Sequence, residues 1–176
     1  MHETAPLHLA GRMQWLVRAA MLALTIGTFA LWASPAAIEL GLARRVLPSG
    51  TAWITQQAQG LGLLASLVPL TVALLTLWQA DRLFKLYKDG RGLAVEAAFR
   101  LRRIGQGVLL LGLLGPPGVA VLSLILTIAA PVGQRTVAIG FSPQDLALVV
   151  LGAILLAIAS VAEDAASLAE DHAAIV

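Results

Sequence analysis

Four long apolar windows constrain this chain more than any other feature of its sequence. They cover residues 15–33, 60–80, 104–130 and 146–162, and Arg18 is the one charged residue among them. A helix of about 20 residues rises about 30 Å, which is enough to cross the hydrocarbon core of a bilayer. Charged residues make up only 12% of the chain, about half of the roughly 25% usual in soluble domains. We therefore expect an all-α integral membrane protein, a four-transmembrane-helix bundle forming a single membrane domain over residues 1–176.

The first window shares features with a secretory signal peptide, namely a basic start, an apolar core and Ala-Ser before Pro35. Proline directly after a cleavage site is unfavourable, and three more windows follow, so we expect a retained signal anchor. Arg18 lies about one turn inside the window, where its long side chain can reach the headgroups. Trp15 and Trp32 near the two ends are expected to be interfacial aromatic residues.

The distribution of basic residues predicts the orientation. The loop over residues 81–103 holds seven of the twelve Lys and Arg residues, and Arg12 and Arg18 lie on the same side of the membrane. The loops over residues 34–59 and 131–145 hold only Arg44, Arg45 and Arg135. Because cytoplasmic segments carry the excess of Lys and Arg, we expect both termini in the cytoplasm. The localisation that follows is a multi-pass membrane protein with its basic loop in the cytoplasm.

The outer segments allow two local structures. Residues 51–55 and 136–141 are rich in β-forming residues, and they are predicted to pair as a small outer β element. Residues 36–47 are instead compatible with a short interfacial helix that carries Ile38, Leu42 and Val46 on one face.

The start of the fourth helix is marked by Ser142-Pro143-Gln144-Asp145. This order places Ser at the N-cap, Pro at the first helical position and an acid at the third.

Pro116 and Pro117 interrupt the third window and predict a kink or break near Leu114. Broken helices can form ion or substrate sites in transporters. We favour a bend that fits the helix around its neighbours, because the sequence places no charged partner nearby. Pro69 in the second window has the same interpretation.

The window interiors contain no other ionisable residue, which removes the usual machinery of proton relays and intramembrane catalysis. We expect the polar residues there to bond to their own helix or a neighbour; they include Thr25, Thr28, Ser66, Thr71, Thr76, Gln106, Ser123 and Thr127. The chain has no Cys, and its three His residues lie in terminal segments. Glu170, Asp171 and His172 are adjacent in sequence and do not share a helix face, so they form a poor chelate. No catalytic, cofactor-binding or metal residue is predicted, and we do not expect an enzyme.

Small residues four positions apart predict close helix contacts. The pairs are Ala153 with Ala157 and Ala23 with Gly27. Such contacts can form within one chain or between copies, so a homo-oligomer stays open.

The 81–103 loop has internal structure beyond its charge. The second helix is expected to continue through Lys88, and Asp89-Gly90-Arg91-Gly92 predicts a turn. A second helix over residues 95–103 should run into the third window, with Glu96 and Arg100 paired at i,i+4. Leu93, Ala97, Leu101 and Ile104 form its apolar stripe.

The C-terminal tail, residues 163–176, is acidic. We expect it to be helical to about Ala169 and to lean toward the basic loop, which has a net charge of +4. Anionic lipid headgroups are a rival and compatible partner for the loop. The low net charge of +2 gives no support for direct nucleic-acid binding. The candidate cytoplasmic contact surface consists of Arg82, Lys85, Lys88, Arg91, Arg100, Arg102, Arg103, Glu163, Asp164, Glu170 and Asp171.

Four segments carry a family resemblance. They are LF-x-LY-x-x-G, the LRRIG that ends the loop helix, PVGQRTVAIGFSPQDL, and the tail EDAASLAEDHAAIV. In this order they resemble the bacterial DUF2975 family of small membrane proteins, whose molecular function is unassigned. The resemblance implies four transmembrane helices, a location in the bacterial inner (cytoplasmic) membrane, and a cytoplasmic partner such as a helix-turn-helix regulator. Many members place Phe-Thr where this chain has Leu93-Ala94, and Ala is a poor N-cap.

These observations favour a non-enzymatic regulatory or interaction module that acts through the basic loop and acidic tail. The alternative is a small transporter or channel component that uses the Pro-kinked third helix.

Overall fold

The computed structural model describes residues 5–47, 52–89, 95–131 and 133–174, with side chains described for residues 11–168 of these ranges. Its long helices are α1 (Ala5–Ala33), α4 (Gln56–Lys88), α5 (Val95–Thr127) and α6 (Pro143–Ala174). Each contains a segment long and apolar enough to cross a membrane. The prediction of an all-helical architecture with four helices able to span a membrane is confirmed. With 33 residues each, α4 and α5 are about 50 Å long, so they extend beyond the hydrocarbon core.

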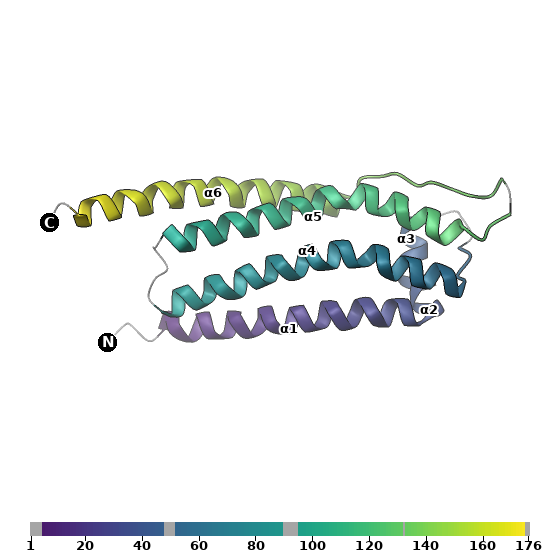
Figure 1. Cartoon of the computed structure of the whole chain (residues 1–176), viewed down its shortest axis with the longest axis horizontal. Coiled ribbons are helices and arrows are strands. Elements are labelled where there is room, and N and C mark those ends of the chain that lie inside the picture. Colours follow the sequence, from purple (N-terminus) through teal and green to yellow (C-terminus); the bar gives the residue numbers. More distant parts are fainter. Residues whose placement is uncertain (1–4, 48–51, 90–94, 132, 175–176) are drawn as a thin grey trace.

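The long helices pack in chain order. The main contacts join α1 to α4, α4 to α5, and α5 to α6. Figure 1 shows them as a row, with α1 and α6 at opposite edges. Along the helix axes, the N-terminal end of α1 and the C-terminal end of α6 lie at the same end of the bundle. The bundle therefore has two edge helices, and its apolar outer surface is available to lipid.

Glycines permit the close approach of α5 and α6. A Cβ atom at Gly112 would lie 2.7 Å from the backbone oxygen of Asp145, and one at Gly152 would lie 2.6 Å from the backbone nitrogen of Leu109. The predicted small pairs do not have this role within the chain. Ala23, Gly27, Ala153 and Ala157 are all exposed, and a Cβ atom at Gly27 would meet nothing within 4 Å. Their use between two copies stays a prediction.

Short helical elements cover the end of the bundle that lies opposite the chain termini. They are α2 (Pro35–Ile38), the π-helical turn η1 (Glu39–Ala43) and α3 (Arg44–Val46), and together they confirm the predicted short helix. Ile38 is completely buried and Val46 is 5% exposed. Both pack in one core cluster with Trp32 and Leu126.

Trp32 is part of this core, so its prediction as an interfacial residue is wrong. Only 3% of the residue is exposed, and its indole Nε1 donates a hydrogen bond to Ser66 Oγ at 2.9 Å. This hydrogen bond joins the C-terminal end of α1 to α4. Gly62 makes room for the ring, because a side chain at that position would collide with it. Trp15, in contrast, is 75% exposed, as an interfacial residue would be.

The predicted outer β element does not form in the part of the chain that the structure describes. Residues 52–55 and 134–142 are irregular up to the helix starts, and three of their backbone donors bond to α5. Trp53 N donates to Leu126 O at 2.8 Å, and Ala138 N donates to Ser123 Oγ at 2.9 Å. Thr127 Oγ1 similarly accepts from Thr136 N at 3.4 Å.

Pro116 and Pro117 bend α5 without breaking it. The helix is continuous from Val95 to Thr127, and Figure 1 shows that it changes direction along its length. α4, which contains Pro69, curves beside it. The two rings remove two backbone donors, but the neighbouring turns keep the helix intact. The bend is confirmed, and a break near Leu114 is not found.

α6 begins with the capping arrangement that the sequence predicts. Ser142 Oγ accepts from Asp145 N at 3.1 Å, and Asp145 Oδ2 accepts from Ser142 N at 2.9 Å. These reciprocal bonds satisfy donors at the helix start that have no partner within the helix. They fix the point at which α6 starts, beside Gly112 and Gly115 of α5.

Candidate functional site

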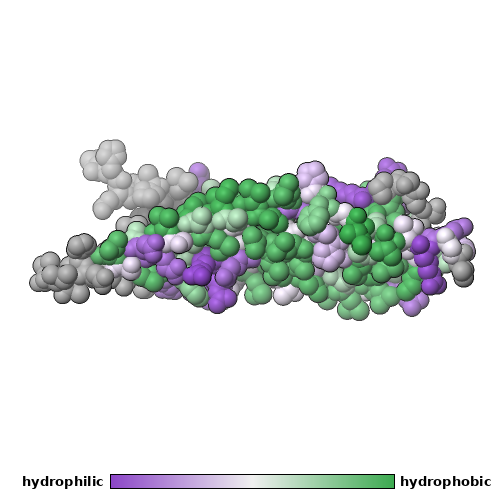
Figure 2. All heavy atoms as spheres, turned by 90° about the horizontal axis from the view of Figure 1, so that it is seen from above, coloured by the Kyte–Doolittle hydropathy of each residue, from purple (hydrophilic) through white to green (hydrophobic). Residues whose placement is uncertain are grey.

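Charged side chains gather where α4 ends and α5 begins, and we call this region the charged end. Figure 2 shows hydrophilic residues toward the two ends of the molecule and a hydrophobic band between them. α4 continues to Lys88, and α5 starts at Val95, so the predicted helical extensions are both confirmed. Residues 90–94, with Arg91 and most of the predicted turn, lie outside the described residues.

An apolar seam joins the two helical extensions. Leu83 and Leu86 of α4 pack with Ala97 of α5 in one buried cluster, and Leu101 and Ile104 pack against it. This confirms the predicted apolar stripe of the loop helix, apart from Leu93, which is not described. Burial of this seam holds the basic residues on rigid turns instead of a flexible loop.

Arg100 lies at the centre of the charged end, with its side chain 21% exposed. Its Nη2 atom donates to Glu96 Oε1 at 3.0 Å, which confirms the predicted i,i+4 pair. Its Nη1 atom donates to Gln79 Oε1 at 3.0 Å, a contact between α5 and α4. The Nε atom is buried and has no acceptor among the described residues. The guanidinium therefore connects two polar side chains, Glu96 and Gln79, and keeps one unsatisfied donor.

An ion pair joins α1 to α4 at the charged end. Arg18 Nε donates to Asp81 Oδ1 at 2.8 Å, and Nη2 donates to Oδ2 at 3.4 Å. Sequence reasoning missed this pair and placed Arg18 among the lipid headgroups. A signal was present, because Asp81 ends the second apolar window at the same membrane face at which Arg18 enters the first.

The tail of α6 also reaches the charged end. Arg102 Nη1 donates to Glu163 Oε2 at 3.3 Å, so the first acidic residue of the tail contacts the basic segment, and the lean of the rest of the tail stays a prediction. α6 is helical through Ala174, five residues beyond the predicted end. Asp164 is exposed, and the side chains of Glu170 and Asp171 are not among those described.

Four cations at this end form no ion pair with a described residue. Arg82 lies over the ring of Trp78 at 5.2 Å, and Arg103 lies over Phe99 at 5.1 Å. Lys85 and Lys88 are exposed on the last turns of α4. We refer to Arg82, Lys85, Lys88 and Arg103 as the unpaired cations. Their positive charge is free to meet an external anion.

Comparison with models of known protein families, with curated proteins and with solved structures finds no match. The chemistry of the charged end therefore rests on its own residues. Within the described ranges, no three His, Cys, Asp or Glu side chains cluster in a way that could hold a metal ion.

A second candidate site lies at the proline bends. A cavity of about 260 Å³ between α4 and α5 is lined by Pro69, Pro117 and aliphatic residues. Ser66 also lines it, but its hydroxyl already accepts from Trp32. The hydroxyls of Thr25, Thr71 and Thr76 donate to carbonyl oxygens one turn earlier in their own helices, as predicted. The bend thus offers an apolar surface and little chemistry.

Proposed function

We propose that this protein is a non-enzymatic regulatory or interaction module of the membrane, with the charged end as its contact surface. The observation that carries the proposal is the presence of four unpaired cations on rigid helical turns. Arg102 and Glu163 link these turns to the acidic tail. A surface that combines positive charge on helical turns with an acidic neighbour suits an acidic partner whose binding competes with the tail.

The proposal places both termini and the charged end in the cytoplasm of a bacterium. Its support is the excess of Lys and Arg at this end over the three at the other, Arg44, Arg45 and Arg135. The resemblance to the DUF2975 family stays a hypothesis, and so does the helix-turn-helix regulator that it implies as a partner. Anionic headgroups are a second ligand for the same cations, at about 1 kcal/mol for each basic residue near the surface.

A transporter or channel component is the alternative, and it has less support. Transport sites in broken helices use backbone groups that the break releases. Here α5 stays helical through Pro116 and Pro117, and the adjacent cavity is mainly apolar.

In-cell photo-crosslinking tests the interaction role. A photoreactive residue at Lys85, exposed at the charged end, is compared with one at Arg45, exposed at the opposite end. We expect one defined cytoplasmic protein to crosslink from position 85 alone. Replacing Arg82 and Lys88 with Gln should then abolish that crosslink, because the attraction is electrostatic.

Two results would contradict the proposal. One is a crosslinking pattern that is the same at positions 85 and 45, or unchanged by the neutral variants. The other is robust solute flux by the purified protein in proteoliposomes, which would favour the transporter.

A further inference from the structure

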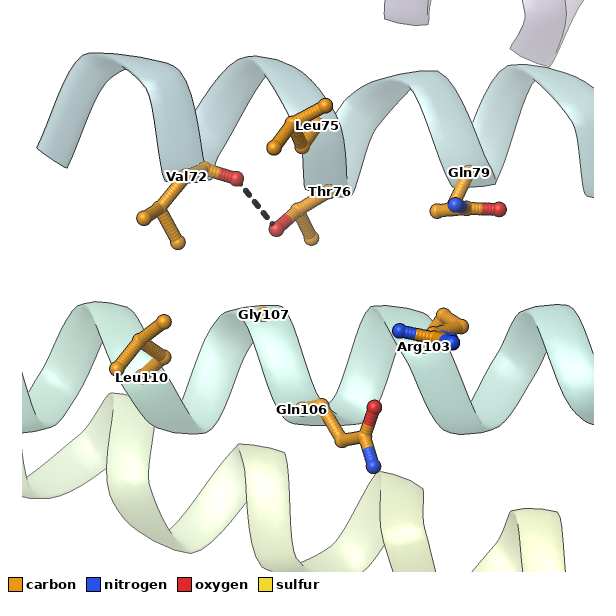
Figure 3. Close-up of a pocket in the computed structure, with 8 residues that line it drawn as sticks. All are labelled: Val72, Leu75, Thr76, Gln79, Arg103, Gln106, Gly107 and Leu110. Carbon is orange, nitrogen blue, oxygen red and sulfur yellow. Dashed lines mark hydrogen bonds between the residues drawn. The ribbon is translucent and has the colours of Figure 1, made fainter. Parts of the chain in front are cut away.

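A crevice of about 300 Å³ lies between α4 and α5 beside the charged end. Its lining changes along the helices, as Figure 3 shows. Gln79 and Arg103 lie at one end, and Val72 and Leu110 lie at the other. The described residues that line the crevice include no carboxylate. The crevice is therefore polar and positive toward the helix ends, and aliphatic toward the middle of the membrane.

The floor of the crevice is formed where a glycine of α5 lies close to α4. Gly107 of α5 faces Thr76 of α4, and any side chain at position 107 would collide with that threonine. The Thr76 hydroxyl is already satisfied, since it donates to Val72 O at 2.7 Å. A ligand at the floor therefore needs to make only apolar contacts there.

The polar end offers donors that have no acceptor. Arg100 Nη1 donates to the side-chain carbonyl oxygen of Gln79, so the amide NH2 group of Gln79 is still able to donate. Arg103 has only the ring of Phe99 as a partner in the described part of the chain. Donors near the hydrocarbon are costly when they are unsatisfied, because little water is present there to accept from them.

We propose that this crevice binds one anionic phospholipid, with the phosphate at Arg103 and Gln79 and an acyl chain along Val72, Leu75 and Leu110. A phosphate diester supplies the acceptors and the negative charge that these donors lack. The aliphatic wall selects a lipid over a soluble phosphate, which has nothing to place against it. The inference goes beyond the proposed function, because it requires neither a protein partner nor a particular orientation of the chain.

Native mass spectrometry of the full-length protein in mild detergent tests the site. Phosphatidylglycerol, phosphatidylcholine and inorganic phosphate are the probes. We expect one tightly retained phosphatidylglycerol for each chain, no retained phosphatidylcholine, and no competition by inorganic phosphate. Arg103→Gln should weaken retention roughly tenfold, since it removes charge-assisted hydrogen bonds. Leu110→Trp should weaken it without any change of charge, because the larger ring fills the aliphatic part.

Arg12→Gln is the matched control, since Arg12 is also an exposed cation but is not one of the unpaired cations and does not line the crevice. Circular dichroism of each variant confirms that the helices remain. Three results would overturn the proposal. They are no retained lipid on the wild-type chain, equal losses in the Arg103 and Arg12 variants, and displacement by inorganic phosphate.

Discussion

Arg18 holds both carboxylate oxygens of Asp81, with Nε at 2.8 Å from Oδ1 and Nη2 at 3.4 Å from Oδ2. Because α1 packs mainly on α4, this pair secures the edge helix at the charged end. The hydrogen bond from Trp32 to Ser66 secures it at the other end. The two partners differ in environment, since the Arg18 side chain is 61% exposed and that of Asp81 is 14% exposed.

That difference predicts an asymmetric double-mutant cycle. Arg18→Gln should lower thermal stability more than Asp81→Asn, because it leaves a mostly buried carboxylate without a counter-charge. The double variant should be about as stable as Asp81→Asn alone. Thermal unfolding in detergent, followed by circular dichroism, measures the cycle. Simple addition of the two losses would show that the pair is not coupled.

Close packing of α5 on α6 predicts that Gly112 cannot be enlarged. Gly112→Val would place a Cβ atom 2.7 Å from Asp145 O and 2.9 Å from Val149 N, both of them backbone atoms. We expect overpacking to cost about 1–3 kcal/mol of unfolding free energy. Gly27→Val is the matched control, since a side chain there meets nothing within 4 Å. Equal stabilities of the two variants in a denaturant titration would refute the close contact.

The capping arrangement at the start of α6 predicts the effect of Ser142→Ala. Loss of an N-cap hydroxyl should cost about 0.5–2 kcal/mol and should raise hydrogen exchange in the first turn of α6. Ser167→Ala serves as the control, because its hydroxyl only donates to Asp164 O at 2.9 Å within the helix. If exchange in the first turn stays unchanged, the cap does not stabilise the helix start.

The pair between Arg102 and Glu163 predicts local protection of the tail. Glu163→Gln should raise hydrogen exchange in the adjacent turns of α6 by about fivefold at most, the range of an exposed pair. Asp164→Asn removes the same charge from a side chain that forms no ion pair in the described structure, so it should have a smaller effect. Identical exchange in the two variants would mean that the contact does not hold the tail.

The absence of cysteine from the sequence allows a direct measurement of orientation. Single Lys88→Cys and Arg135→Cys variants each lose one positive charge, so the excess of basic residues at the charged end is preserved. A membrane-impermeant maleimide should label Cys at position 135 in intact cells, and Cys at position 88 only after permeabilisation. The reverse pattern would place the charged end outside the cytoplasm.

The sequence could predict the four helices because their windows are long, apolar and bounded by charge. It also predicted contacts between residues close in the chain, such as Glu96 with Arg100 and Ser142 with Asp145. Arg18 and Asp81 are 63 residues apart, so their contact depends on which helices are neighbours, and hydropathy does not carry that information.

Two predictions are wrong, each for its own physical reason. Trp32 near the end of an apolar window is equally consistent with a lipid interface and a protein core, because both environments are apolar. The β-forming residues before α6 lacked a strand partner because Ser123 and Thr127 supply acceptors from α5. A lone sequence does not show that a helix side chain can take the place of a neighbouring strand.

The chain-order packing of α1, α4, α5 and α6 has a consequence for biogenesis. From α4 onward, each long helix packs against the long helix synthesised just before it, and α6 completes the row without separating earlier contacts. Assembly can therefore keep pace with translation, and no early helix has to wait for a distant segment to cover it.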